Sequence, residues 1–104
     1  MLLDTGATLC VVPTAIARAI GHDPNKSRRR MNFPTASGVL TAPVIVMDYV
    51  SALGYTVQDV EAACRDFPPP STIDGLLGLS FLRHFRLEID FRSGRIELEH
   101  SEAP

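Results

Sequence analysis

A single carboxylate on a tight turn constrains this sequence more than any other feature. Asp4 opens the tripeptide Asp-Thr-Gly, between the apolar pair 2–3 and the apolar run 9–12, which Pro13 closes. A carboxylate among apolar segments is costly to bury unless a nearby group shares its charge or its proton. The sequence contains Asp-Thr-Gly once. If the turn is catalytic, the second carboxylate must therefore come from another chain.

The composition is that of one small globular domain. The chain has 104 residues, 45% of them hydrophobic and 21% charged, which is typical of a folded protein with a modest core. A net charge of −2 predicts neither a nucleic-acid partner nor binding to a membrane surface. The sequence has no apolar run long enough to span a bilayer and no signal-peptide pattern at its start. We expect no membrane segment in this chain and take the cytoplasm as the default location.

The cysteines and histidines do not form a metal-binding pattern. Cys10 and Cys64 are far apart, and there is no Cys-x-x-Cys pair and no Cys/His cluster, which argues against a zinc site. We expect two buried thiols rather than a disulfide. The three histidines also lack ligand spacing and are expected to serve packing or the surface.

The hydrophobic pattern predicts a strand-rich fold with short helices. Strands are expected at 9–12, 31–50 (two arms around a turn at 34–38), 55–64 and 73–79, with a hairpin at 86–99 and helices at 15–20 and 80–85 capped by Thr14 and Ser80. The proline run 68–70 predicts a loop at 65–72, because proline cannot join a sheet interior. The arginine run 28–30 could bind an acidic partner, although such runs more often form a solvated face.

Hydrolysis of a peptide bond by paired carboxylates makes specific demands on the sequence. Two acids must lie around one water and share a proton, so that one acts as base toward the water while the other polarises the scissile carbonyl. The acid must sit on a rigid turn, a small hydroxyl residue must bond across to the opposing turn, and a glycine must allow close backbone approach. Asp4, Thr5 and Gly6 are those residue types in that order.

Three segments together extend this pattern over nearly the whole chain. They are Leu-Leu-Asp-Thr-Gly-Ala-Thr at 2–8, Thr-Ala-Ser-Gly at 35–38 and Ile-Asp-Gly-Leu-Leu-Gly-Leu-Ser-Phe-Leu at 73–82. With these segments the chain resembles the retropepsin-like aspartic proteases, the family of the retroviral proteases and their bacterial and eukaryotic relatives. The bacterial branch is the most similar, and the closing hairpin at 87–98 also fits it.

The resemblance implies a role for each matching residue. Asp4 would be the catalytic acid and base, and Thr5 would bond across a dimer to lock the two active-site turns. Gly6 would accept the substrate backbone at close range, with Ala7 completing the turn. The flap over the substrate would be formed by Thr35, Ala36, Ser37 and Gly38, and the turn and cleft wall would be supported by Leu76, Leu77 and Gly78.

Other interpretations of the same residues remain open at this stage. Asp4 could be a plain turn residue that bonds its own backbone. Asp74 and Asp90 are the alternative carboxylates, the first before a glycine and the second in an alternating strand. The chain could also be a catalytically silent module of this fold that serves dimerisation or peptide binding, or an unrelated β-barrel binding module.

The resemblance implies an all-β fold: a closed, mostly antiparallel β-barrel of the acid protease type with one or two short helices. We expect residues 1–104 to form one such domain, without the strand that usually precedes the catalytic turn in the family. The expected activity is that of an aspartic endopeptidase, a homodimer with one active site on its two-fold axis. Its partner would be a peptide or protein substrate, not nucleic acid, and no metal or organic cofactor is required.

Overall fold

The computed structural model describes residues 1–68 and 71–100. These residues form strands β1 (Leu2–Leu3), β2 (Cys10–Val12), β3 (Arg30–Thr35), β4 (Gly38–Ala52), β5 (Tyr55–Cys64), β6 (Leu76–Leu77), β7 (Phe85–Asp90) and β8 (Arg95–His100), helices α1 (Thr14–Ala19) and α2 (Leu79–Leu82), and a short 3-10 helix at Pro24–Lys26. The expected loop at 65–72 contains residues 69–70, which lie outside the described residues.

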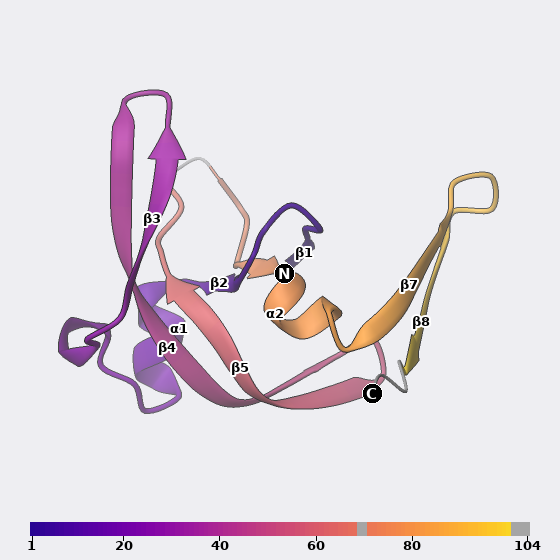
Figure 1. Cartoon of the computed structure of the whole chain (residues 1–104), viewed down its shortest axis with the longest axis horizontal. Helices are drawn as coiled ribbons and strands as arrows, with labels where there is room; N and C mark the ends of the chain where they lie inside the picture. Colours follow the sequence, from indigo (N-terminus) through magenta and orange to yellow (C-terminus); the bar gives the residue numbers. More distant parts are fainter. Residues whose placement is uncertain (69–70, 101–104) are drawn as a thin grey trace.

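Six strands form one curled sheet in the order β1-β6-β2-β5-β4-β3. The long strand β4 pairs with β3 through its first part and with β5 through the rest, so it connects an upright hairpin to the curved floor (Figure 1). The predicted mostly β, mostly antiparallel fold with short helices is confirmed. In the described residues the sheet is a half-barrel, because its edge strands β1 and β3 are not paired with each other.

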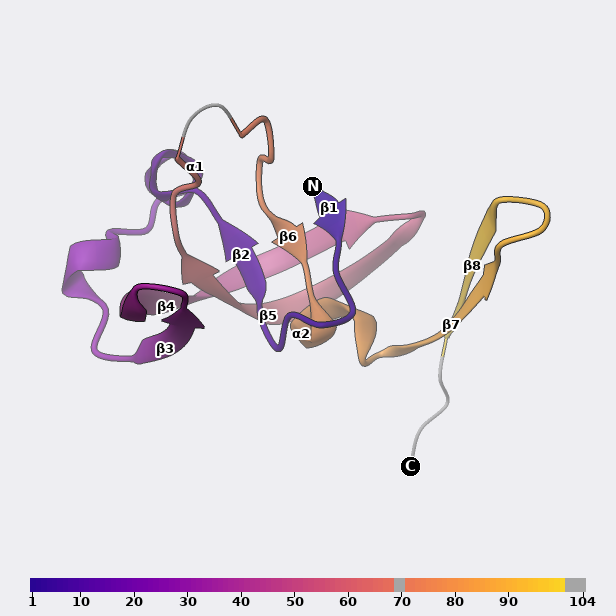
Figure 2. The same ribbon diagram turned by 90° about the horizontal axis from the view of Figure 1, so that it is seen from above.

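The insertion of β6 between β1 and β2 brings the Asp-Thr-Gly segment and the segment at 73–82 together. Strand β6 lies between β1 and β2, parallel to the first and antiparallel to the second (Figure 2). Leu2 and Leu3 are paired with Leu76 and Leu77, and Val11 is paired with Leu76 from the other side. The Asp-Thr-Gly segment and the second apolar-pair-and-glycine segment are therefore neighbours in space, although about seventy residues separate them.

Several predicted elements are confirmed and three predictions are wrong in detail. The strand at 55–64 has the predicted bounds, and its turn from β4 has Leu53 and Gly54 at φ of 54° and 85°, as a tight hairpin requires. The strand expected at 73–79 is only two residues long. Ser80 does not cap the second helix, because α2 begins at Leu79 with Gly78 at its cap. Thr14 lies inside α1 rather than at its cap.

Both cysteines are free and buried, as the sequence predicted. Cys10 belongs to the main core cluster together with Phe81, Val60 and the partly exposed ring of Tyr55. Burial raises the pKa of the Cys64 thiol, and the nearby Asp66 carboxylate adds to the effect. Both thiols act as small apolar core residues.

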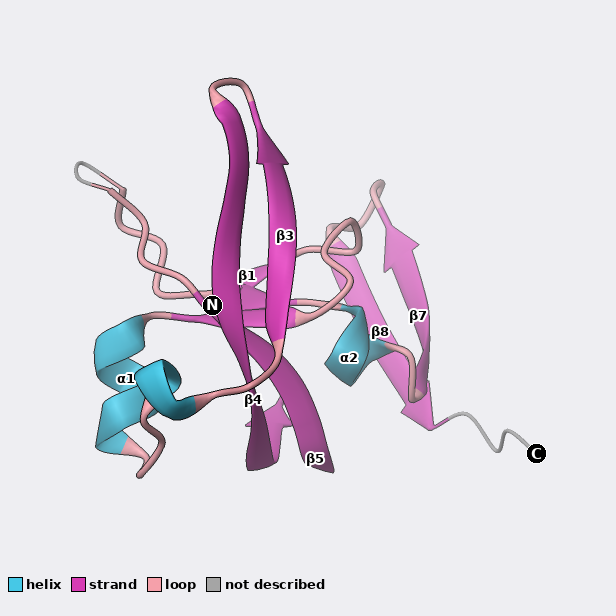
Figure 3. Ribbon diagram, turned by 60° about the vertical axis from the view of Figure 1, so that its left-hand side comes forward, coloured by secondary structure: helices cyan, strands magenta, loops and turns pink. Residues whose placement is uncertain are grey.

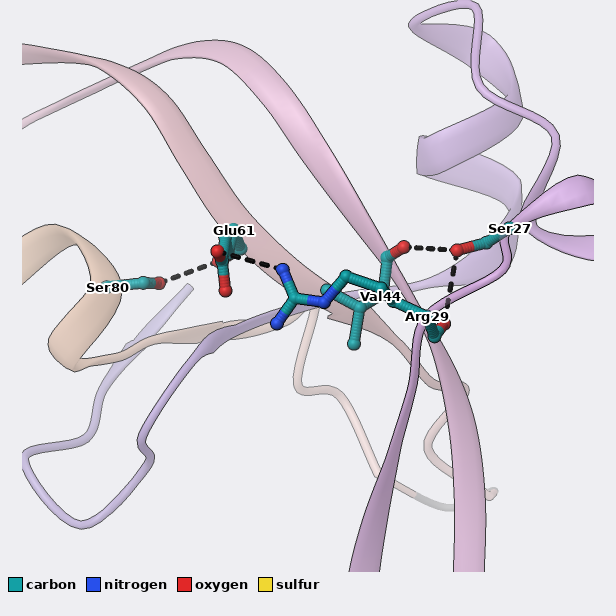
Figure 4. A network of polar contacts seen from close by, with 5 residues as sticks. All are labelled: Ser27, Arg29, Val44, Glu61 and Ser80. Carbon is teal, nitrogen blue, oxygen red and sulfur yellow. Dashed lines mark hydrogen bonds and ion pairs between the residues drawn. The ribbon is translucent and has the colours of Figure 1, made fainter.

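The arginine run 28–30 contributes a structural ion pair. The Arg29 guanidinium lies 2.9 Å from the Glu61 carboxylate, which holds the pKa of that carboxyl below its usual range (Figure 4). The Ser27 hydroxyl lies within hydrogen-bond distance of the carbonyl oxygens of Arg29 and Val44. These contacts fasten the start of β3 to β4 and β5. Within the run, Arg29 therefore pairs with a carboxylate of its own chain.

The C-terminal hairpin β7–β8 is a separate two-stranded sheet that projects from the body of the molecule (Figure 1). The hairpin is attached at its base, where the centroids of the Tyr55 and Phe85 rings lie 4.9 Å apart. The Tyr55 hydroxyl also donates a hydrogen bond to the Leu98 carbonyl there. The predicted hairpin is thus confirmed, with its tip extending beyond the core.

Candidate active site

The Asp-Thr-Gly turn is fixed by short hydrogen bonds on both sides. The Asp4 amide donates to the Leu77 carbonyl at 3.0 Å, and the Ala7 amide donates to the Asp4 carbonyl at 3.3 Å. The Asp4 carboxylate accepts a hydrogen bond from the Gly6 amide at 2.9 Å through Oδ1. Among the described residues we find no hydrogen bond to Oδ2, so half of the carboxylate is free to face a ligand.

The second apolar-pair-and-glycine segment packs directly beneath this turn. The Leu79 amide donates to the Ala7 carbonyl at 2.8 Å. A Cβ atom on Gly78 would lie 2.4 Å from the Leu9 carbonyl oxygen and 2.8 Å from that of Ala7, closer than any side chain can approach. Glycine is therefore required at this position for steric reasons, and its φ of −101° shows that conformational freedom is not the cause.

A buried polar chain supports the same region from below. The Cys10 amide donates to the Ser80 hydroxyl at 2.8 Å, and that hydroxyl donates to the Glu61 carbonyl at 2.7 Å. Ser80 is 1% exposed and connects β2, β5 and α2 through these two hydrogen bonds. Figure 4 shows the bond to Glu61. The Gly78 amide also lies 3.4 Å from the Cys10 sulfur. The turn therefore rests on a platform whose buried polar groups are satisfied.

The Asp4 carboxylate opens into a hollow of about 300 Å³. The hollow lies between the active-site turn, the lower part of the upright hairpin and the end of β5, and its walls include Gly6, Met31, Phe33, Arg65 and Leu76. Asp4 is the one carboxylate among the described residues that line it. An acid on a rigid turn, beside apolar walls, is an arrangement suited to proton transfer to a bound ligand.

The flap residues expected from the sequence form the far tip of the β3–β4 hairpin. Thr35 and Gly38 are the last paired residues, with Ala36 and Ser37 as the turn between them, and all four are exposed (Figure 3). The Thr35 hydroxyl donates to the Gly38 carbonyl at 2.7 Å. The hollow is lined instead by residues 31–34, in the lower part of this hairpin. The tip stands above the site without contacting Asp4 in this conformation.

Comparison with known proteins agrees with this geometry. The sequence model of the family described as aspartyl protease matches residues 1–81, which include the Asp4 turn, the upright hairpin and Gly78. The chain belongs to the aspartyl protease family. The expectation of a retropepsin-like member is confirmed by this match and by the structural similarity described next.

The chain has a fold similar to that of a solved retropepsin-like aspartic protease from Rickettsia conorii. The two structures superpose with a TM-score of 0.65 and 27% sequence identity. The similarity covers 85% of this chain and 64% of that one, so the chain spans less than two thirds of the length of that protein. A comparison with curated proteins gave no match.

The two alternative carboxylates, Asp74 and Asp90, do not line the hollow. Asp74 is exposed beside Gly75. Asp90 accepts hydrogen bonds at the β7–β8 turn, and the Ser93 side chain, with the backbone amides of Arg92 and Ser93, lowers the pKa of the Asp90 carboxyl. Asp90 therefore has the setting of a turn residue, and neither carboxylate is placed to act on a group in the hollow. Asp4 also bonds its own turn, but it alone combines that bond with a place on the hollow.

A second hollow of about 350 Å³ lies between the end of α1 and β4. Its lining includes His22 and Asp48 but no part of the Asp-Thr-Gly turn. We favour the smaller hollow as the active site, because it contains the carboxylate held by a backbone donor. In residues 1–68 and 71–100 we also find no cluster of His, Cys, Asp and Glu suited to a metal ion, and no helix long and apolar enough to cross a membrane.

Sequence reasoning missed the residues that complete the walls of the hollow. Arg65 lies just past β5, and its guanidinium is within cation–π distance of the rings of Phe33 and Phe67. The sequence placed Arg65 in a loop, and nothing in its neighbours signalled a role. The sequence also predicts Ser80 as a helix cap. Only the parallel pairing of β2 with β5 reveals that its hydroxyl connects Cys10 to Glu61.

Replacement of Ser80 tests the platform beneath the turn. We expect Ser80→Ala to lower the free energy of unfolding by about 1–3 kcal/mol, because the Cys10 amide and the Glu61 carbonyl lose a buried partner. Urea denaturation monitored by circular dichroism measures the change. As a matched control, Ser51→Ala removes an exposed hydroxyl bonded to Thr56 and should change stability by at most about 0.5 kcal/mol. Equal effects of the two variants would contradict the supporting role of Ser80.

Proposed function

We propose that this aspartyl protease chain is an endopeptidase that works as a homodimer, with one active site formed by the Asp4 residues of both subunits. The observation that carries the proposal is the Asp4 carboxylate, held by the Gly6 amide at 2.9 Å on the wall of a hollow that contains no second carboxylate among the described residues. A site that needs two acids is then completed by a second copy across a two-fold axis.

The proposed chemistry follows from the proximity of the two carboxylates. Two acids around one water cannot both remain ionised, so they share one proton, which is the established behaviour of aspartic-protease dyads. The ionised Asp4 takes a proton from the water as the water attacks the scissile carbonyl. The protonated Asp4 donates a hydrogen bond to the carbonyl oxygen, where negative charge develops. The Asp4 that took the proton of the water then gives it to the leaving nitrogen as the C–N bond breaks, which releases the two peptide products and leaves the dyad with one proton.

The neighbouring residues would hold the dyad and the substrate. Thr5 is exposed beside Asp4, so its hydroxyl can reach the opposing turn and fix the two turns together. Gly6 and Ala7 line the hollow, where the absence of large side chains permits close approach of a peptide backbone. Leu76 forms part of the wall, while Leu77 and Gly78 hold the turn from below.

The substrate would be an extended peptide between the hollow and the flap. Residues 35–38 would close over it, and its backbone would pair with strand edges as an added strand. The apolar side chains of Val11, Met31 and Leu76 in the lining favour hydrophobic residues near the scissile bond. We include in this proposal the closed barrel and the two-fold arrangement that the family resemblance implies.

Peptide cleavage measured across pH, together with the mass in solution, tests the proposal. We expect a dimer that cleaves peptides best at acidic to mildly acidic pH, where a dyad can carry one proton, and that is inhibited by pepstatin-type compounds. A catalytically silent module would instead form a dimer that cleaves no peptide in a library. A monomer that cleaves peptides would contradict the shared site.

A further inference from the structure

We infer that Arg65 forms a subsite for an acidic side chain of the substrate, next to Asp4. This inference rests on the proposed peptidase function. Arg65 directly follows strand β5 and lines the same hollow as the Asp4 carboxylate. It contributes the one cationic side chain among the described residues of that lining.

Two aromatic rings hold the Arg65 guanidinium in place. Its central carbon lies 5.5 Å from the centroid of the Phe33 ring and 5.8 Å from that of the Phe67 ring, both within the range of cation–π contact. Both rings are partly buried and pack against the small core cluster of Val11, Ala42 and Ala63. These two cation–π contacts favour one position of the guanidinium, so less side-chain entropy is lost when it binds a ligand.

The Arg65 guanidinium has no carboxylate partner within 4 Å among residues 1–68 and 71–100. The ion pairs found in this part of the chain involve Arg18, Arg29, Arg86 and Arg95. The adjacent Asp66 carboxylate instead accepts a hydrogen bond from the Thr14 amide at the start of α1, at 2.9 Å. Arg65 is half-buried and keeps its donors available to a group that enters the hollow.

A carboxylate is the group that this arrangement suits best. Guanidinium presents a planar fork of donors that matches the two oxygens of a carboxylate, and such charge-assisted pairs are stronger than neutral hydrogen bonds. The anions that a peptide carries near an internal peptide bond are the side chains of Asp and Glu. Because a homodimer has two Arg65 residues, the preference should occur at two positions, one on each side of the scissile bond.

Paired peptides that differ only by Glu or Gln test this inference. Each position around the scissile bond is varied in turn, and kcat/KM is measured for wild type, Arg65→Met and Arg65→Glu. We expect wild type to prefer Glu by about tenfold at two positions. Arg65→Met keeps an apolar side chain beside the rings and should abolish the preference, and Arg65→Glu should reverse it, so that Gln is favoured over Glu there. Arg28→Met removes an exposed arginine outside the hollow and should keep the wild-type ratio.

The outcomes separate this inference from the proposed function. Cleavage by wild type with no Glu preference, or a preference that persists in Arg65→Met, would overturn the role of Arg65 and leave the peptidase proposal standing. If wild type cleaves nothing, fluorescence anisotropy of the same labelled peptides decides. Tighter binding of Glu peptides that depends on Arg65 supports the subsite, and equal binding overturns it. If Arg65→Met does not fold, Arg65→Lys should keep only part of the preference for Glu. Full retention of the preference in Arg65→Lys would contradict a pairing that depends on the planar guanidinium.

Discussion

Asp4→Asn is expected to lower kcat/KM for peptide cleavage by about 10³-fold or more. General acid–base groups contribute on this scale, and residues that act as a pair lose their function together. In the proposed homodimer one substitution removes both carboxylates, so no group remains that can take a proton from the water. Asn is nearly isosteric with Asp and can still accept the Gly6 amide hydrogen bond, so the fold should be preserved. Initial rates on a cleavable peptide, with thermal unfolding measured alongside, check both statements.

Two exposed aspartates provide the controls for this result. Asp74→Asn and Asp90→Asn remove a carboxylate outside the hollow and should change the rate less than about twofold, because neither lines the site. The amide oxygen of Asp90→Asn can still accept the hydrogen bonds from the Arg92 and Ser93 amides. Full activity of Asp4→Asn would show that Asp4 has no catalytic role and only forms a hydrogen bond within its own turn. A loss of kcat/KM in Asp74→Asn as large as in Asp4→Asn would contradict the assignment of catalysis to Asp4 alone.

Gly78→Ala is expected to be among the most destabilising single substitutions in this chain, at about 3 kcal/mol. The added Cβ would lie 2.4 Å from the Leu9 carbonyl oxygen and 2.7 Å from the Leu9 carbonyl carbon, and both are backbone atoms that no side-chain rotation can move. Relief requires the active-site turn to shift, which breaks the hydrogen bond from Leu79 to Ala7. A domain of this size is typically stable by 5–15 kcal/mol, so the loss is a large fraction of the total.

Gly54→Ala separates this clash from the general cost of replacing glycine. Gly54 has a φ of 85°, and a Cβ there would meet nothing within 4 Å, so its replacement should cost only about 1 kcal/mol from backbone strain. Chemical denaturation of both variants measures the difference. We also expect any folded fraction of Gly78→Ala to lose activity at least about 10²-fold, since a 1 Å misplacement of a catalytic group has that effect. Equal stability of the two variants would show that the two segments are not packed as described.

Local patterns made much of this fold predictable. The strand at 55–64 alternates apolar and polar residues and follows a Leu-Gly turn, so both its period and its start are visible in the sequence. The two arms around residues 34–38 and the closing hairpin were predictable for the same reason. These elements pair with their neighbours in the chain, and their turns require residues that tolerate a left-handed backbone.

The segments that were predicted less well depend on partners far away in the sequence. Ile73 to Leu79 is apolar enough for a strand, but only Leu76 and Leu77 find a place between β1 and β2. Ser80 has the composition of a cap, yet its hydroxyl is drawn into the core by the Cys10 amide and the Glu61 carbonyl. Local propensity cannot anticipate such long-range contacts.

The candidate site was predictable in its centre but not in its walls. The order of Asp4, Thr5 and Gly6 is visible in one line of sequence because the chemistry needs adjacent residues. Phe33 belongs to β3 and Arg65 follows the end of β5, and only the folding of the upright hairpin over the end of β5 brings them together. The proposed Arg65 subsite therefore lies in the part of the candidate site that sequence patterns reveal least.

Subunit mixing tests the central claim of one active site made by two Asp4 residues. Wild type is mixed with an equal amount of Asp4→Asn at a concentration where light scattering shows only dimers, and the subunits are allowed to exchange. Because mixed dimers would have one carboxylate, we expect cleavage to fall to about half of that given by the same amount of wild type alone. Unchanged activity after mixing and exchange would show that each chain works by itself, and would contradict a shared site.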